Sequence, residues 1–377
     1  MDKPAILKAT VPATVPAKTG LRVYELLASV NDASRSSRAG LILLIALTFY
    51  YGLALSLVTD RDLLAGNPIN LPLLGVPVGL RRFLLLAPLV YLFIHLGVLL
   101  EQAGFSKKAQ ALVNMLEGQE IVEMAVTRKP TVHPLRYEVS TFYLAQLIAG
   151  PPENLLIRFF QQLMVWSTLV FLPLSVLLGF QIAFLPLHDL AAIWALRAYL
   201  TADIVLLVLL GVFLTSGERE FWPALGFVVA RTALLCGITA LTFIIFLFLA
   251  FGAATVPGEW LDRKLSSTRF AIVVPGGPGQ AMRRVFAPTA DLFEGMVDEA
   301  GRVHSPFHRN LIVIGDDLSP RETAPQRPPL SLRYRDLRYA RFDRSNLSQA
   351  DLTCANLTGA VMTGAKLDGI KSGCPYE

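Results

Sequence analysis

Long apolar runs alternate with polar segments along most of this chain. Uncharged runs cover residues 39–58, 83–100, 159–185 and 232–254, and a shorter one covers residues 204–214. About 20 apolar residues suffice for a helix to cross a hydrocarbon core of about 30 Å. The pattern therefore predicts four to five membrane-spanning helices within residues 39–257. The run at 204–214 is short for a full crossing, and for this reason both numbers stay open.

The segments between these runs differ in character. Residues 1–38 form a polar and basic lead, expected to be disordered until about Leu21 and helical after it. Residues 67–80 are apolar, but three prolines argue against a spanning helix and favour an interfacial or re-entrant segment. Residues 102–158 predict a soluble loop with two or three amphipathic helices. Residues 258–329 predict a small linking or capping domain, with strands at RFAIVV and RNLIVIGDD.

Residues 330–369 carry the sharpest pattern, a repeat of five residues. A large apolar residue recurs at every fifth position, namely at Leu332, Leu337, Phe342, Leu347, Leu352, Leu357, Met362 and Leu367. A small residue lies two positions before most of these, at Ala340, Ser345, Ala350, Ala355, Ala360 and Ala365. A period of five fits neither a helix nor a strand. It predicts a solenoid in which each repeat forms one side.

This register resembles the pentapeptide-repeat family. The resemblance implies a right-handed quadrilateral β-helix with four repeats per coil, so that eight repeats make about two coils. Both the large central residue and the small residue two before it would point inward. Leu332 would then stack on Leu352, and Phe342 on Met362. Arg335 occupies an inward position that a small residue should fill, so we expect an irregular first coil that needs a cover from the preceding segment.

The order of elements is also similar to a group of bacterial multi-span membrane proteins that end in pentapeptide repeats. The stretches that carry this likeness are NLPLLGVPV, FQIAFLPLHD and HRNLIVI. The resemblance implies an architecture, and it brings no activity or catalytic residue with it.

Composition supports a membrane protein and bears on its orientation. The chain is 53% hydrophobic and 17% charged, and its mean hydropathy is +0.51. In such a protein basic residues report topology more often than nucleic-acid binding. Basic residues in 1–38 and 102–158 predict a cytoplasmic N-terminus in a bacterial inner membrane. Further basic residues after the last run favour cytoplasmic repeats, whereas five full crossings would place the repeats outside.

The three cysteines predict no metal site and no disulfide framework. Cys236 lies in an apolar run, Cys354 in the repeats and Cys374 near the end, without metal-ligand spacing. We expect Cys354 and Cys374 to be accessible to solvent.

Polar residues in or near the apolar runs are functional candidates because they are costly in a membrane. They are His95, Gln181, His188, Arg197, Asp203 and Arg231. A proton or ion pathway would need several of them at one depth. His95 and Gln181 lie near ends of their spans that face opposite sides, so we do not expect them to meet. Interfacial anchoring and helix–helix hydrogen bonding are the alternative roles.

No pattern in the chain supports an enzyme. We find no serine elbow, paired-carboxylate site or zinc-protease motif, and we expect no catalytic, cofactor-binding or metal site. The PGGPGQ loop lacks the lysine and serine of a phosphate-binding loop. His304 and His308 flank Pro306, which favours a loop over a zinc-binding helix.

The repeats therefore point to binding rather than catalysis. Residues 330–370 have a net charge of plus two, which argues against mimicry of a nucleic acid, and no nucleic-acid partner is expected. The outward arginines form a candidate interaction face for anionic lipid headgroups or an acidic protein, or a plain solvated face: Arg333, Arg338, Arg341 and Arg344. We predict a non-catalytic, membrane-anchored scaffold that presents the repeats to a protein partner or a second copy. The alternative is a transporter or channel whose repeats serve gating or assembly.

Overall fold

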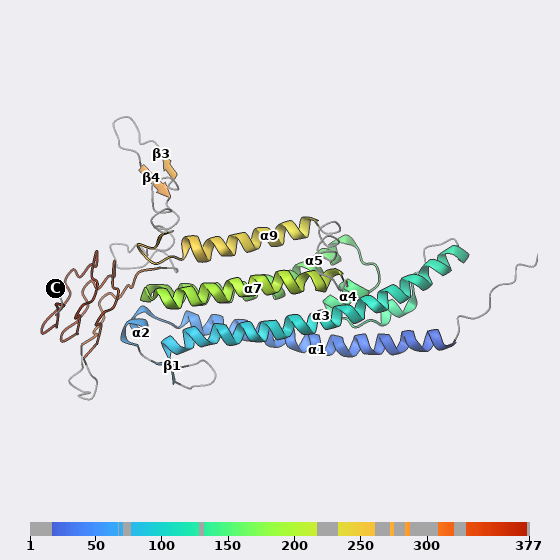
Figure 1. The fold of residues 1–377 in the computed structure, drawn as a ribbon, viewed down its shortest axis with the longest axis horizontal. Coiled ribbons are helices and arrows are strands. Elements are labelled where there is room, and N and C mark those ends of the chain that lie inside the picture. Colours follow the sequence, from blue (N-terminus) through green and yellow to red (C-terminus); the bar gives the residue numbers. More distant parts are fainter. Residues whose placement is uncertain are drawn as a thin grey trace, which may run out of the picture.

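The computed structural model of the chain describes residues 17–66, 68–70, 77–127, 132–216, 233–260, 272–274, 283–286, 308–319 and 329–374. Long helices lie side by side, and the repeats sit at one end of them (Figure 1). Five helices are long and apolar enough to cross a membrane. The prediction of four to five apolar helices is confirmed at five.

Three of these helices are continuous, and two contain a π-helical segment. In chain order they are α1 (Ala17–Ser56), α3 (Leu80–Thr127), α5 with η2 and α6 (Leu155–Trp166, Ser167–Phe171, Leu172–Phe184), α7 (Leu190–Ser216), and α9 with η4 (Ala233–Phe248, Leu249–Ala253). Pro173 explains η2, because its missing N–H removes one α-helical hydrogen bond and the backbone readjusts around the gap.

The fourth helix differs from the prediction. The uncharged run at 204–214 was short for a full crossing, but α7 is one helix of 27 residues, about 40 Å long. Its polar residues Arg197 and Asp203 do not mark an end, because both are buried against neighbouring helices. The helix is therefore long enough for a full crossing.

The second helix also extends further than predicted. α3 has 48 residues and continues to Thr127, so part of the expected soluble loop prolongs the span. α1 pairs with α3 beyond the apolar part, where Ser37 donates to Gln102 at 2.6 Å. The rest of this region holds a 3₁₀-helix (Pro134–Glu138) and α4 (Tyr143–Ala149).

Each long helix runs opposite to the one before it. The start of α1 and the repeats consequently lie at opposite ends of the molecule (Figure 1). If all five helices cross one membrane, this arrangement corresponds to the alternative in which five crossings separate the repeats from the N-terminal region.

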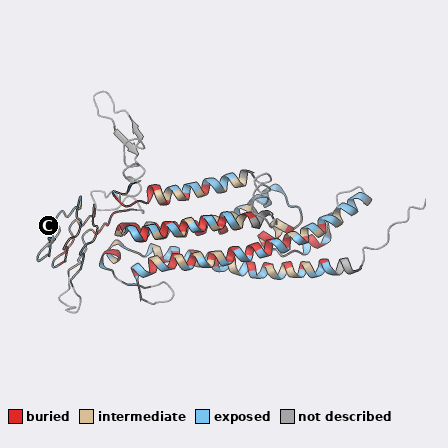
Figure 2. Cartoon of the chain, viewed as in Figure 1, coloured by how far each residue is buried: buried red, intermediate tan, exposed pale blue. Residues whose placement is uncertain are grey.

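The core of the helical region lies where α1, α3, α6 and α7 meet. Buried residues line the faces between the helices, and exposed residues line the outward faces (Figure 2). The ring of Tyr51 contacts two others there, with its centroid 5.8 Å from that of Tyr91 and 5.3 Å from that of Phe180. Outward faces carry exposed large apolar side chains, such as Phe49 and Ile244. An apolar outer face is what a lipid-embedded helix requires.

Short elements connect the helices. α2 (Asp60–Ala65) is capped by Thr59, whose side chain accepts from the Asp62 N–H, and ends at Gly66 with φ 66°. β1 (Pro68–Asn70) pairs with β2 (Pro77–Gly79) in the segment that was expected not to span. β3 (Ile272–Val274) lies within the predicted strand RFAIVV and pairs with β4 (Arg283–Phe286).

The repeats form stacked coils of 20 residues. Isolated parallel bridges join Ser331 to Asp351, and further pairs at the same separation follow: Asp336–Asn356, Arg341–Val361, Asn346–Lys366 and Asp351–Lys371. A separation of 20 residues corresponds to four five-residue repeats per coil. The described part of the repeats contains single bridges and no extended strand. The bridges give the stacking register that was expected from the repeat pattern.

A turn closes each repeat at its corner. In the first repeat the Arg335 N–H donates to the Leu332 carbonyl at 3.2 Å. The residue before the donor has positive φ, as a type II turn requires. The positions are Tyr334, Tyr339, Arg344, Gln349, Cys354, Gly359, Gly364 and Gly369. Only the last three are glycine, so the first coil adopts a backbone that its side chains disfavour.

The inward positions are most enclosed in the first coil. The buried residues there and just below are Leu332, Leu337, Ala340, Phe342, Ser345, Leu347, Ala350 and Leu352. The later inward residues are only partly buried: Ala355, Leu357, Ala360, Met362, Ala365 and Leu367. The array is closed at the end near the helices and more open at its C-terminal end.

Candidate functional site

The strongest concentration of polar contacts lies at the joint between the helices and the repeats. We use "joint" for α2, the turn at His188, the turn at Val256–Glu259, residues 308–319 and the first coil. Residues 308–319 bridge to the first coil through Ile312–Arg341 and Asp317–Asn346. This segment was expected to be a strand in a capping domain. It makes single bridges instead, and it covers two sides of the first coil.

Arg335 is the residue that departs from the repeat pattern, and α2 explains it. Its guanidinium Nη1 donates to the carbonyls of Leu64 at 3.0 Å and Leu63 at 3.4 Å. These carbonyls lie in the last turn of α2, where an arginine also interacts favourably with the helix dipole. Burial, and then the nearby Arg81, lower the pKa of Arg335. The inward arginine thus ties the first coil to the helical region.

Asp60 fixes residues 308–319 from the other side of α2. Its Oδ2 accepts from His308 Nε2 and from the Ile312 N–H, both at 2.7 Å. His308 is therefore a structural contact of the joint, and His304 lies outside the described residues. Arg61 adds a hydrogen bond to the Asp317 carbonyl at 3.4 Å.

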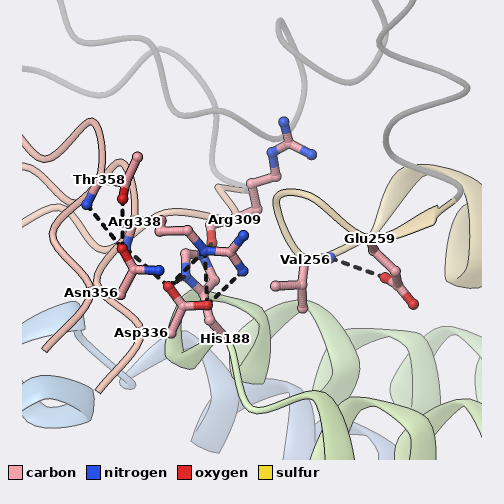
Figure 3. A network of polar contacts seen from close by, with 8 residues as sticks. All are labelled: His188, Val256, Glu259, Arg309, Asp336, Arg338, Asn356 and Thr358. Carbon is pink, nitrogen blue, oxygen red and sulfur yellow. Dashed lines mark hydrogen bonds and ion pairs between the residues drawn. The ribbon is translucent and has the colours of Figure 1, made fainter. Parts of the chain in front are cut away.

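His188 and Asp336 connect the end of η3 (Leu185–Leu187) to the second repeat (Figure 3). His188 is buried with φ 51°. Its Nε2 donates to the Arg309 carbonyl at 2.8 Å, and its Nδ1 lies 3.7 Å from Asp336 Oδ1. Arg338 donates to the same carboxylate, with Nη2–Oδ2 at 2.6 Å. Burial alone would raise the pKa of Asp336, but the nearby His188 ring and the hydrogen bonds from Arg338 outweigh it and hold that pKa far below its usual range.

The turn after the fifth helix also reaches the coil (Figure 3). Gly258 has φ 84°, and a Cβ at this position would lie 2.7 Å from Arg338 Nη1. Glycine is favoured here by the backbone angle, and any other residue would also have to displace the end of the Arg338 side chain. Three separate parts of the helical region therefore hold the first coil in place.

The outward arginines do not gather on one face. Arg333 and Arg338 lie in successive repeats, which form adjacent sides of a four-sided coil. Arg338 is paired with Asp336, Arg341 with Asp343 at 2.8 Å, and Arg333 approaches Asp351 at 3.7 Å. Arg344 is exposed at a corner. Acidic neighbours offset much of the charge that the sequence suggested as a single basic cluster.

Two of the polar candidates of the membrane region meet in its core. His95 on α3 and Asp203 on α7 are both 0% exposed, with Nδ1–Oδ1 at 2.6 Å. One turn away, Tyr91 and Thr48 share a hydrogen bond of 2.7 Å between their hydroxyl oxygens. The sequence placed Asp203 near the end of a short span. The longer α7 moves it to the middle.

Gln181 and Arg197 serve a different purpose, at the end of the fifth helix. Gln181 Nε2 donates to the Ala250 carbonyl at 2.7 Å, and Arg197 Nε donates to the same oxygen at 3.0 Å. Arg197 also binds Glu259, with Nη2–Oε2 at 3.0 Å. These contacts satisfy carbonyls that the π-helical segment η4 leaves open. Arg231 lies outside the described residues.

A disulfide joins Cys354 and Cys374, which the sequence analysis did not expect. The two cysteines are 20 residues apart, one coil of the array, so they lie one above the other. The signal was present in the spacing, because the five-residue register predicts which residues stack. Cys236 on α9 is free of any disulfide.

Comparison with known proteins bears on the C-terminal part of the chain. Residues 336–369 match the family model of pentapeptide repeats in eight copies. The count agrees with the eight repeats of the predicted register. No curated protein and no solved structure matches the chain.

Proposed function

We propose that this protein is a non-catalytic, membrane-anchored scaffold whose repeats bind a protein partner. The observation that carries the proposal is a difference between the two coils in their contacts with the helical region. The first coil contacts the helical region through Arg335, which donates to the Leu64 carbonyl at 3.0 Å, and through Asp336, which lies 3.7 Å from His188. Residues 308–319 cover the same coil and are bonded to the helical region through His188–Arg309 at 2.8 Å and Asp60–Ile312 at 2.7 Å. The second coil makes no such contact within the described residues.

A coil mounted rigidly at one end presents its outer sides and its open end in a fixed orientation. Solenoids are stabilised by stacking and need covered ends, and the second coil remains partly exposed at its inward positions. A partner or a second copy that packs on this coil would bury Val361, which is 38% exposed. We regard the coils as the right-handed quadrilateral β-helix that the repeat family implies.

Deleting residues 330–377 should abolish partner capture by in-cell crosslinking, with membrane insertion intact. A finer variant, Thr363→Arg, places a bulky charge on an exposed residue of the second coil. The matched control Thr141→Arg changes an exposed residue at the opposite end of the molecule. Loss of the crosslinked species with Thr363→Arg and its retention with Thr141→Arg support the proposal. An unchanged crosslinked species in the deletion variant would refute it.

We further propose that the repeats face away from the cytoplasm. The sequence stretches before the first apolar run, between the second and third, and between the fourth and fifth hold fourteen basic residues: Lys3, Lys8, Lys18, Arg22, Arg35, Arg38, Lys107, Lys108, Arg128, Lys129, Arg136, Arg158, Arg219 and Arg231. The connections at the repeat end of the helices carry three: Arg61, Arg81 and Arg82. By the positive-inside rule the first of these two sets is cytoplasmic, and a long C-terminal region is exempt from the rule. This proposal replaces the expectation of cytoplasmic repeats.

The disulfide supports the same orientation. Disulfides persist in oxidising compartments and are rare in the cytosol. The Cys354–Cys374 bond suits repeats on the outer side of a bacterial cytoplasmic membrane. A partner of the repeats would then be an envelope protein or another extracytoplasmic protein.

Transport is a second candidate function, favoured by the buried pair His95–Asp203. It predicts that the purified chain in liposomes conducts ions or protons and that His95→Gln reduces the flux. A liposome with no flux above the protein-free background would count against transport and would leave the scaffold proposal standing.

A further inference from the structure

The membrane core contains one acidic residue. Asp203 is the only aspartate or glutamate in the apolar stretches 39–58, 83–100, 155–187, 190–212 and 235–253. It is 0% exposed. An acidic group at this position is costly unless a partner or a proton neutralises it.

The depth of the pair places it far from both ends of the helices. His95 is 15 residues after the start of α3 and Asp203 is 13 residues after the start of α7. At 1.5 Å per residue these distances are about 20 Å. In a hydrocarbon core of about 30 Å, the pair lies well inside the apolar layer.

No cation in the described spans balances Asp203. The titratable groups of the neighbouring parts of α1, α3 and α7 are phenols, namely Tyr50, Tyr51, Tyr91 and Tyr199, and the described part of α6 has no titratable residue. Arg197 lies almost two turns away on α7, and its charge is offset by Glu259, with Nη1–Oε1 at 2.5 Å. The imidazole of His95 is the one partner in position to carry a neutralising proton.

The hydrogen bond sets the protonation states that the pair can adopt. With a neutral imidazole, His95 Nδ1–H donates to the Asp203 carboxylate and the pair carries one negative charge. One more proton, on His95 Nε2 or Asp203 Oδ2, makes the pair neutral. Both of these atoms are buried and have no hydrogen-bond partner. They are vacant positions for that proton.

We infer that His95 and Asp203 form a proton-binding site in the membrane core, where the pair holds one proton more than a neutral imidazole beside a carboxylate. The site does not depend on the scaffold role of the repeats, and it does not require net transport. It assigns the proton as the ligand of this pair.

The test is the protonation state of the pair in the full chain reconstituted in lipid nanodiscs at pH 7. Nitrogen-15 NMR of labelled histidine reports whether both ring nitrogens of His95 carry hydrogen, with His95→Gln used to assign the signals. Infrared spectroscopy reports a protonated Asp203 through its carboxylic C=O band. We expect one of the two methods to detect the extra proton in the wild type.

Asp203→Asn is the decisive variant, because the amide keeps the size of the side chain and an oxygen that accepts from His95. In this variant His95 should have a single N–H and no carboxylic band should remain. His95→Gln should leave Asp203 protonated, with its band present. His133→Gln, a histidine outside the apolar stretches, should change neither signal of the pair. A wild-type His95 with a single N–H, together with no infrared band that Asp203→Asn removes, would overturn the inference.

Discussion

Removing the disulfide should lower the stability of the second coil by a free energy that follows from the length of the loop the disulfide closes. Cys374→Ser opens a loop defined by a sequence separation of 20 residues. The chain-entropy relation for a loop of this length gives a stabilisation of about 3 kcal/mol. Hydrogen exchange is the suitable assay, because the amides whose hydrogen bonds join this coil to the residues after it are known. Leu352 N–H donates to the Lys371 carbonyl at 2.8 Å, and Cys354 N–H to the Gly373 carbonyl at 3.2 Å.

A loss of about 3 kcal/mol corresponds to exchange faster by roughly two orders of magnitude at these amides. A reducing agent should have the same effect on the wild type and no effect on Cys374→Ser. Cys236→Ser, at the cysteine of α9 that forms no disulfide, is the matched control and should exchange like the wild type. Reducing agent that leaves the wild-type rates unchanged would show that the coil does not rely on this bond.

Other predictions concern the joint and the core of the coil. Because the pKa of Asp336 is lowered in the folded state, its stabilising contribution is complete above its unfolded pKa and is lost as pH falls below about 4; Asp336→Asn should abolish this part of the acid sensitivity in a proteolysis assay of the coil. Phe342→Ala removes a fully buried ring and should cost about 3–5 kcal/mol of coil stability in denaturant unfolding, with α-helical circular dichroism retained. Gly359→Ala should destabilise the coil by about 1–2 kcal/mol in the same assay, since its φ is 71° and the added Cβ would lie 2.7 Å from the Tyr339 ring. Gln349→Gly, at φ 64°, should have no cost or a small gain; equal losses in both variants would contradict the turn geometry.

The sequence predicted the repeats well because their period is local and strict. Every fifth residue must meet the same environment, so Leu332 and its seven successors could be identified without any knowledge of the rest of the chain. The membrane helices followed from length and hydropathy for a similar reason. The fourth helix was predicted too short because Arg197 and Asp203 interrupt the uncharged run, and their partners on other elements cannot be read from the sequence.

Long-range pairings could not be predicted from a local pattern. Arg335 looked like a defect in the repeat, and only the position of α2 shows that it binds the carbonyls of Leu63 and Leu64. His95 and Asp203 are 108 residues apart in sequence, and their contact depends on the packing of α3 against α7. The disulfide could have been predicted, because the repeat register places Cys354 and Cys374 one coil apart and therefore in neighbouring stacked positions.

The orientation of the repeats is tested most directly by labelling lysines in intact cells. An amine reagent that cannot cross the membrane is applied, and labelled peptides are identified by mass spectrometry before and after the cells are opened. Lys366 and Lys371 are exposed on the second coil, and Lys107 and Lys108 are exposed on α3 near the other end of the molecule. We predict labelling of Lys366 and Lys371 in intact cells and of Lys107 and Lys108 only after opening. Labelling of Lys107 and Lys108 first, or protection of all four until the cells are opened, would contradict repeats displayed on the far side of the membrane.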